Sequence, residues 1–328
     1  MLKRSVVCSL AVASAVLLAL LVRAQAAESF PGDAAIRIVV PVGPGGPPDV
    51  ISRLIGREMS EARGWRVVIE NRPGALTTIA IADVLRQRAD ALSIFPMSSG
   101  AVAVPALLPE KGIRLETEFA PVAEIASGYL VLVTHPSVPA KSVAELIALL
   151  RAQPDRLSFS SGGFGTPAHL IGELFKLRTG TRATHVPYPG SQPRVADLLN
   201  GTTQFAFFNT PAVVDHIATG RLRALAVTAP ARVAALRDVP TVGEQGFPDL
   251  LMADWQGFVV KNGSPQHAIA LLNEAVNNAL AQQRIRAALA RIGYEPVGGT
   301  PSEFGELIRS QVAHWGKVVA ESGIKVQQ

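Results

Sequence analysis

Residues 158–170 read SFSSGGFGTPAHL, the pattern of a short strand, a glycine loop and the start of a helix. Three glycines allow positive φ and a close approach of the backbone to a ligand. Pro167 fits the first position of a helix, where its missing N–H is not needed. The free N–H groups and the positive dipole end of that helix face the loop. The stretch therefore predicts an anion cradle with hydroxyls from Ser161 and Thr166, and a carboxylate is the commonest small anion it would fit.

Two other interpretations of this loop remain open. Residues 163–168 match G-x-G-x-x-A after a strand, the dinucleotide-binding fingerprint. That fingerprint needs an acidic residue about 20 positions later, and the next expected strand, 183–186, offers none. The second alternative is a glycine-rich turn without a ligand. The cradle is favoured because a loop of similar design occurs earlier in the chain.

The earlier loop is VGPGGPPD at 42–49, between a β-branched strand at 36–41 and an amphipathic helix at 50–62. Asp49 is either a cap for free N–H groups or a ligand contact. Further strands are expected at 66–70 and 91–95, the last ending in a polar Ser98-Ser99-Gly100 loop. Strands alternating with helices predict a parallel sheet, in which ligands bind beyond the carboxyl ends of the strands.

Two crossing strands indicate a hinged pair of lobes. Residues 120–133 read as a strand passing between the lobes, and 222–228 as a strand returning to the first lobe. Ser142 to Glu145 forms a capping box at the start of a helix. We expect lobe 1 at residues 27–126 and 231–328, lobe 2 at 127–230, and hinges near 125–128 and 227–230.

The amino terminus has the three parts of a secretory signal peptide. A charged start, an apolar core at 5–22 and an Ala24-Gln25-Ala26 cleavage site predict residues 1–26 as the signal, cleaved after about Ala26. The alternative is an uncleaved anchor, since the core has 18 uncharged residues. Cys8 is the only cysteine, so the mature chain would have neither disulfides nor a cysteine nucleophile.

Charge and motifs exclude several functions. The formal net charge of +5 falls to +2 when Lys3, Arg4 and Arg23 are removed with the signal, leaving 28 basic and 26 acidic residues. No basic run occurs, so nucleic acid is not an expected partner. No metal-ligand motif, phosphate loop or G-x-S-x-G sequence is present, and no cofactor is expected. A hydrolase using Ser161 and His169 is the alternative from another class.

The chain resembles the extracytoplasmic solute receptors of tripartite tricarboxylate transporters, the Bug family. The matching segments span almost the whole expected mature chain: IRIVVPVGPGGPPDVISRL at 36–54, VVIENRPGA at 67–75, SSGGFGTPAHLIGELF at 160–175, HVPYPG at 185–190, GRLRALAVT at 220–228, DVPTVGEQGFP at 238–248 and EPVGGTPSEF at 295–304. The resemblance implies a two-lobed α/β periplasmic binding protein of the Venus-flytrap, type II-like kind, each lobe a mainly parallel sheet flanked by helices.

The resemblance also implies how a ligand carboxylate is held, by backbone amides and hydroxyls of the two glycine loops. The matching positions are Gly45, Gly46, Asp49, Ser161, Gly163, Gly165 and Thr166. Where the family usually has Asp-Asn, this chain has Phe208-Asn209. Loss of that acid favours a neutral, aromatic or second carboxylate group over an ammonium in the distal pocket. The expected lining residues there are Ser98, Asn209, Thr210 and Trp255, with plain core packing as the alternative for Trp255.

These patterns predict a periplasmic, monomeric solute receptor and no enzyme. It would capture a small organic acid between the lobes for membrane permease subunits or for a sensor protein. Besides the hydrolase, a receptor-derived scaffold that no longer binds a ligand remains an alternative.

Overall fold

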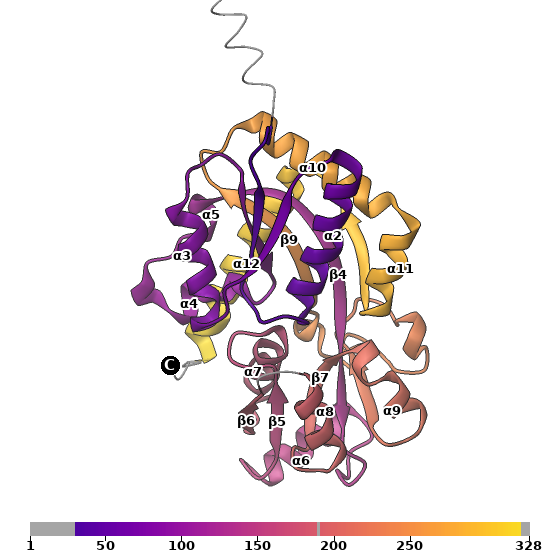
Figure 1. Cartoon of the computed structure of the whole chain (residues 1–328). Coiled ribbons are helices and arrows are strands. Elements are labelled where there is room, and N and C mark those ends of the chain that lie inside the picture. The colour runs from indigo at the N-terminus through magenta and orange to yellow at the C-terminus, as the bar shows by residue number, and fades with distance from the viewer. Residues whose placement is uncertain (1–29, 189–190, 323–328) are drawn as a thin grey trace, which may run out of the picture.

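The computed structural model describes residues 30–188 and 191–322, which form two lobes (Figure 1). The signal peptide expected at 1–26 lies outside these residues. The strands are β1 (Ile36–Val40), β2 (Val67–Asn71), β3 (Ser93–Ser98), β4 (Phe119–Thr134), β5 (Ser158–Ser161), β6 (Thr184–Pro187), β7 (Phe205–Asn209), β8 (Arg223–Val227), β9 (Ala253–Lys261) and β10 (Tyr294–Gly298). The helices are α2 (Pro47–Arg63), α3 (Thr78–Arg86), α4 (Val104–Leu107), α5 (Leu115–Glu118), α6 (Val143–Ala152), α7 (Pro167–Thr179), α8 (Ser191–Leu199), α9 (Val214–Ala218), α10 (Gln266–Ala281), α11 (Gln283–Arg291) and α12 (Pro301–Ser322).

One sheet runs through both lobes in the order β2-β1-β3-β9-β4-β7-β5-β6, and β8 and β10 pair with β4 beside this path. The expected parallel pairing holds for β2-β1-β3 in lobe 1 and β6-β5-β7 in lobe 2. The strands between these two sets pair antiparallel. The two-lobed α/β fold is therefore confirmed, with antiparallel strands joining the two parallel sets.

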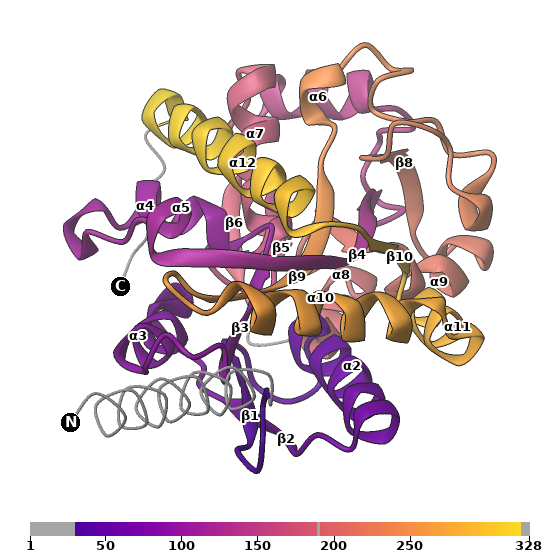
Figure 2. The ribbon, with the colours of Figure 1, turned by 90° about the horizontal axis from the view of Figure 1, so that it is seen from above.

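Lobe 1 is built around β1, which is buried because helices cover both faces of its sheet. Ile38 pairs with Ile94 of β3, and both are fully buried. Side chains from α2, α10 and α11 pack on one face of the sheet, and side chains from α3 and α12 on the other. Figure 2 shows α10 and α12 on opposite sides of β4. This packing directs the carboxyl ends of β1 and β3 toward lobe 2.

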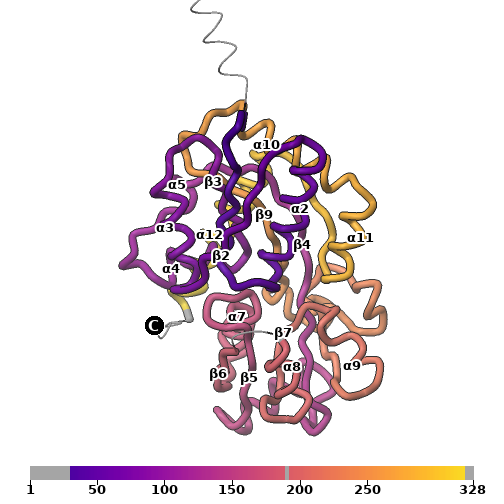
Figure 3. The backbone as a smooth tube through the Cα atoms, viewed as in Figure 1, coloured from indigo at the N-terminus to yellow at the C-terminus, as the bar shows by residue number. Residues whose placement is uncertain are grey.

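β4 crosses between the lobes, as expected for residues 120–133 (Figure 3). Its register pairs Phe119 through Tyr129 with β9, and Leu130 through Thr134 with β7. The expectation that residues 222–228 return to lobe 1 is wrong, because β8 pairs with the lobe 2 end of β4. The returning strand is β9. A local strand pattern could not distinguish these two possibilities, since both segments are apolar and β-rich.

Hydrogen bonds attach part of the segment between β8 and β9 to lobe 2. Gln245 donates through Nε2 to the Leu225 carbonyl at 2.6 Å, and its Oε1 accepts from the Val143 N–H at 3.1 Å. We therefore propose that lobe 1 resumes near residue 251 rather than 231. Within lobe 2 half of the expected capping box is present at the start of α6. Ser142 Oγ accepts the Glu145 N–H at 3.1 Å, but the Glu145 carboxylate accepts the N–H of Lys141, at 2.7 Å, in place of that of Ser142.

Glu124 on β4 should make stability depend on pH. Burial raises the pKa of its carboxyl from 4.5 to about 7. A raised pKa in the folded state means that its contribution to stability is fully present below about pH 4.5 and is lost as the pH rises through 7. Glu124→Gln should remove this loss, so the variant gains free energy of unfolding relative to the wild type between pH 5 and pH 8 in urea titrations. Glu295→Gln, at an exposed position on the neighbouring β10, is the matched control; an equal effect in both variants would contradict the assignment.

Candidate ligand-binding site

The two glycine loops have the same backbone conformation. After β1, Gly45 has φ +88° and Gly46 has φ −72°, ψ 158°. After β5, Gly165 has φ +71° and Thr166 has φ −71°, ψ 155°. A proline then begins the helix in each case. Gly163 also has a positive φ of +111°. Positive φ is therefore confirmed for Gly163 and Gly165 but not for Gly162. Each lobe supplies one copy of the same strand–loop–helix unit.

The third residue of each helix accepts a hydrogen bond from the glycine loop that precedes the helix. Asp49 Oδ2 accepts the Gly45 N–H at 2.9 Å, and His169 Nδ1 accepts the Gly165 N–H at 3.2 Å. In both units the acceptor lies four residues after the glycine. Asp49 and His169 are thus structural counterparts. Their side chains differ in chemistry, and the sequence did not reveal that they are equivalent.

Asp49 stabilises the first loop. It is buried, and it also accepts hydrogen bonds from Arg53 and from Asn71 Nδ2, the latter at 2.8 Å. Burial opposes ionisation, but hydrogen bonds from Arg53, the Gly45 N–H and Asn71 together lower the pKa of the carboxyl. Because these partners occupy the carboxylate, the capping interpretation is favoured over direct ligand contact.

Hydroxyl groups stabilise the second loop. Ser161 Oγ lies 2.6 Å from His185 Nε2, accepts the Gly163 N–H at 3.1 Å and donates to the Gly163 carbonyl at 3.0 Å. Thr166 Oγ1 donates to the same carbonyl at 2.7 Å. A hydroxyl has a single donor, and the Ser161 and Thr166 hydroxyls both donate to the Gly163 carbonyl in this structure. The N–H groups of Gly45, Gly163 and Gly165 are likewise bonded within the protein, so ligand contact at these positions stays a prediction.

Two buried histidines lie behind the second loop. The ring centroids of His169 and His185 are 4.4 Å apart, and the Phe164 ring packs edge-on against both. Burial lowers the pKa of His169 to about 3 and of His185 to about 4, so both are neutral at neutral pH. His169 is thus a packed residue, and Ser161 contacts His185 rather than His169. The serine–histidine pair of the hydrolase alternative does not form, because the pairing of β5 with β6 brings His185 to Ser161.

The two lobes touch at the second loop. Gly100, in the polar loop after β3, approaches Gly165 so closely that a Cβ atom on Gly100 would lie 2.5 Å from the Gly165 carbonyl oxygen. From the loop after β2, Leu76 Cδ2 lies 2.5 Å from the position that a Cβ on Gly165 would take. The start of α7 lies against lobe 1 in Figure 3. The second glycine loop is therefore in van der Waals contact with lobe 1.

A buried carboxylate lies where the lobes join. Asp254 of β9 accepts hydrogen bonds from four side chains, Ser99 Oγ, Asn209 Nδ2, Gln256 Nε2 and Tyr294 OH, at 2.5 to 3.3 Å. Burial raises the pKa of Asp254, and these hydrogen bonds oppose the rise. The sequence expectation named Asn209 and the adjacent Trp255 but missed Asp254, because no motif marks the carboxylate itself as a site residue.

The other expected lining residues have different environments. Ser98 and Thr210 are half-buried, at the end of β3 and just after β7. Trp255 is 1% exposed and packs edge-on against Phe304, with ring centroids 5.5 Å apart. This burial favours the core alternative for Trp255, and ligand contact by Ser98, Asn209 and Thr210 stays a prediction.

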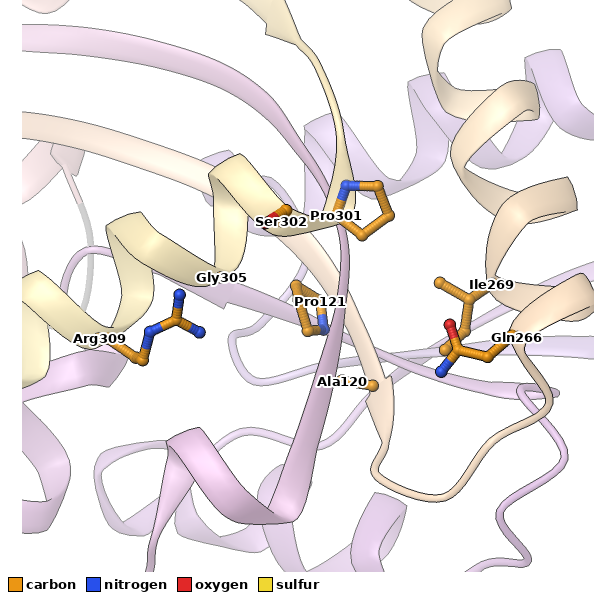
Figure 4. Close-up of a pocket in the computed structure, with 8 residues that line it drawn as sticks. All are labelled: Ala120, Pro121, Gln266, Ile269, Pro301, Ser302, Gly305 and Arg309. Atoms are coloured by element: carbon orange, nitrogen blue, oxygen red, sulfur yellow. The ribbon is translucent and has the colours of Figure 1, made fainter.

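A separate cavity of about 180 Å³ lies in lobe 1 between β4, α10 and α12 (Figure 4). It is lined by Ala120, Pro121, Gln266, Ile269, Pro301, Ser302, Gly305 and Arg309. None of these residues belongs to a glycine loop. In the described part of the chain, no three His, Cys, Asp or Glu side chains are grouped to hold a metal ion, and no helix has the length and apolar character to cross a membrane.

Comparisons agree with this architecture. The model of the tripartite tricarboxylate transporter family receptor matches residues 51–324. Protein BugT of Bordetella pertussis is 35% identical over 303 residues, covering 92% of this chain and 93% of BugT. Rpa4515 of R. palustris, solved with adipate, has a TM-score of 0.80 at 34% identity over 91% of this chain and 100% of that one. MatC from Rhodopseudomonas palustris, solved with bound malate, has a TM-score of 0.78 at 28% identity over 87% and 98%.

The fold and the paired loops therefore define a two-lobed solute-binding protein. The chain belongs to the tripartite tricarboxylate transporter receptor family, also represented by the Bug proteins.

Proposed function

We propose that this protein is a periplasmic receptor that captures a small organic acid between its lobes and presents it to membrane permease subunits or to a sensor protein. The main support is the matched pair of glycine loops, one at the carboxyl end of β1 and one at that of β5. Each loop places glycine backbone at the start of a helix, where the helix dipole favours an anion. Adipate and malate in two family structures support a carboxylate ligand.

The loops should distinguish a carboxylate from its amide. A charge-assisted hydrogen bond is worth about 1.5–3 kcal/mol, against about 1 kcal/mol for a neutral one. We expect adipate or malate to bind at least about tenfold more tightly than the corresponding diamide, since 1.4 kcal/mol corresponds to a factor of ten. Isothermal titration calorimetry on the mature chain measures the ratio.

A loop variant tests whether this preference belongs to the site. Gly163→Val should abolish it, because valine disfavours the φ of +111° that Gly163 adopts. Gly220→Val, at another positive-φ position with open space around it, is the control for backbone strain alone. Equal affinities of the wild type for acid and amide would refute the proposed function.

A further inference from the structure

Residues 75–77, in the loop after β2, form a left-handed run that contains no glycine. Ala75 has φ 44°, Leu76 has φ 50° and ψ 49°, and Thr77 has φ 70° and ψ −8°. Residues other than glycine rarely adopt this region, because their Cβ atom comes too close to the following carbonyl oxygen. A positive φ is a marked outlier for a β-branched residue such as Thr77. Three such residues in succession are therefore a strained segment.

Local contacts do little to compensate this strain. Ala75 is exposed, and its carbonyl accepts hydrogen bonds from the N–H and from Oγ1 of Thr78 in a tight turn. Thr77 Oγ1 is buried and has no hydrogen-bond partner in the described chain, which makes the conformation still less favourable. Strained backbone persists only where the surrounding structure imposes it, so a contact from outside the loop is needed.

Leu76 makes such a contact with the other lobe. Its Cδ2 atom lies 2.5 Å from the position that a Cβ on Gly165 would take, so the leucine lies directly against the backbone of the second glycine loop. Leu107 of α4, also in lobe 1, has its Cδ1 atom 4.0 Å from the same position. Leu76 is half-buried and packs against the main apolar core. The strained run thus directs an apolar side chain of lobe 1 onto the loop of lobe 2.

We propose that residues 75–77 are a strained clasp between the lobes, which forms when the lobes close and relaxes when they open. Two opposed effects then set the balance between the two arrangements. Contact of Leu76 with the Gly165 loop favours closing, whereas strain in the left-handed run favours opening. This inference goes beyond the proposed function, because it concerns the free protein and holds for any ligand. Under the proposed function, the same strain would help a captured acid to leave.

Two neighbouring substitutions should shift the balance in opposite directions. Thr77→Gly relieves strain and keeps the leucine, so it should raise the ratio of closed to open protein about fivefold or more. The reason is that a left-handed residue other than glycine is disfavoured by a factor of about 5–30. Leu76→Ala keeps the left-handed backbone but removes most of the apolar contact, so it should lower the ratio by about fivefold.

Pulsed electron paramagnetic resonance without any ligand measures this ratio. Spin labels are attached to Ala148→Cys in α6 of lobe 2 and Ala270→Cys in α10 of lobe 1, two exposed positions. Figure 1 shows these helices at opposite ends of the molecule. The expected mature chain contains no other cysteine, because Cys8 lies in the expected signal peptide.

Matched controls separate the clasp from general effects of each substitution. Asp155→Gly relieves a positive φ of 58° in the loop before β5, at the opposite end of that strand from the glycine loop. Leu85→Ala shortens another half-buried leucine of lobe 1 that packs against the same core. Both variants should leave the ratio of closed to open protein unchanged.

Ala75→Gly covers the case in which Thr77→Gly does not fold. It removes only an exposed methyl group at a positive φ, and it should also raise the ratio. If the glycine variants raise the free energy of unfolding in urea but leave the ratio unchanged, the strain is equal in both arrangements and the clasp is refuted. An unchanged or raised ratio in Leu76→Ala would also overturn it. These outcomes do not involve a ligand, so the receptor function is decided separately by the calorimetry of acid and amide.

Discussion

Gly100→Ala should weaken binding of the preferred acid by about 10- to 100-fold and prevent the lobes from closing on it. Gly100 has φ −77° and ψ −36°, which alanine adopts without strain. The added Cβ would lie 2.5 Å from the Gly165 carbonyl oxygen of the opposite lobe. Overpacking of this kind costs about 1–3 kcal/mol. Under the proposed capture of the acid between the lobes, the ligand binds the closed form more tightly, so that cost should appear as lost affinity.

Small-angle scattering and calorimetry check this prediction together. The wild type should show a smaller radius of gyration at saturating ligand, and the variant should keep the radius of the free protein. Gly316→Ala is the control, since a Cβ at this helical position would have no neighbour within 4 Å. Normal affinity and normal compaction of Gly100→Ala would show that Gly100 and Gly165 are not in contact in the bound form.

Asp254→Ala should lower the free energy of unfolding by about 3 kcal/mol or more. The substitution removes the acceptor for Ser99, Asn209, Gln256 and Tyr294, and each buried donor left unsatisfied costs about 1–3 kcal/mol. The loss should also weaken the connection between lobes, because Asn209 ends β7 of lobe 2 whereas Ser99 follows β3 of lobe 1. Urea denaturation of the unliganded protein measures the effect.

Two further variants test the origin of that loss. Asp254→Asn keeps one acceptor oxygen and should cost less than alanine. Because burial raises the pKa of Asp254 above its ordinary value of 3.8, the wild type loses stability as the pH rises above 3.8, and the cost of the asparagine variant should fall in the same direction. Asp238→Ala, at an exposed position, should change stability by less than about 0.5 kcal/mol. A similarly small effect for Asp254→Ala would mean that the network contributes little to folding.

The equivalence of Asp49 and His169 gives the two loops different charges. Both accept the N–H of the glycine four residues earlier, but Asp49 is an anion paired with Arg53, whereas burial keeps His169 neutral. The second loop therefore holds its shape without a negative charge. Under the proposed function, an anionic ligand would meet less repulsion at the second loop than at the first.

The sequence by itself determined the strand–glycine loop–helix units, the positive φ of Gly163 and Gly165, the crossing by β4 and the family. These features depend on local backbone chemistry, on apolar periodicity and on the order of motifs, which neighbouring residues specify. Only the tertiary structure decided that His185 contacts Ser161, 24 residues earlier in the sequence, and that Ser99 donates a hydrogen bond to Asp254, 155 residues later. It also decided that β9 returns to lobe 1 and that Leu76 lies against Gly165 of lobe 2. Such contacts follow from strand register and burial, which bring together residues whose local patterns carry no sign of each other.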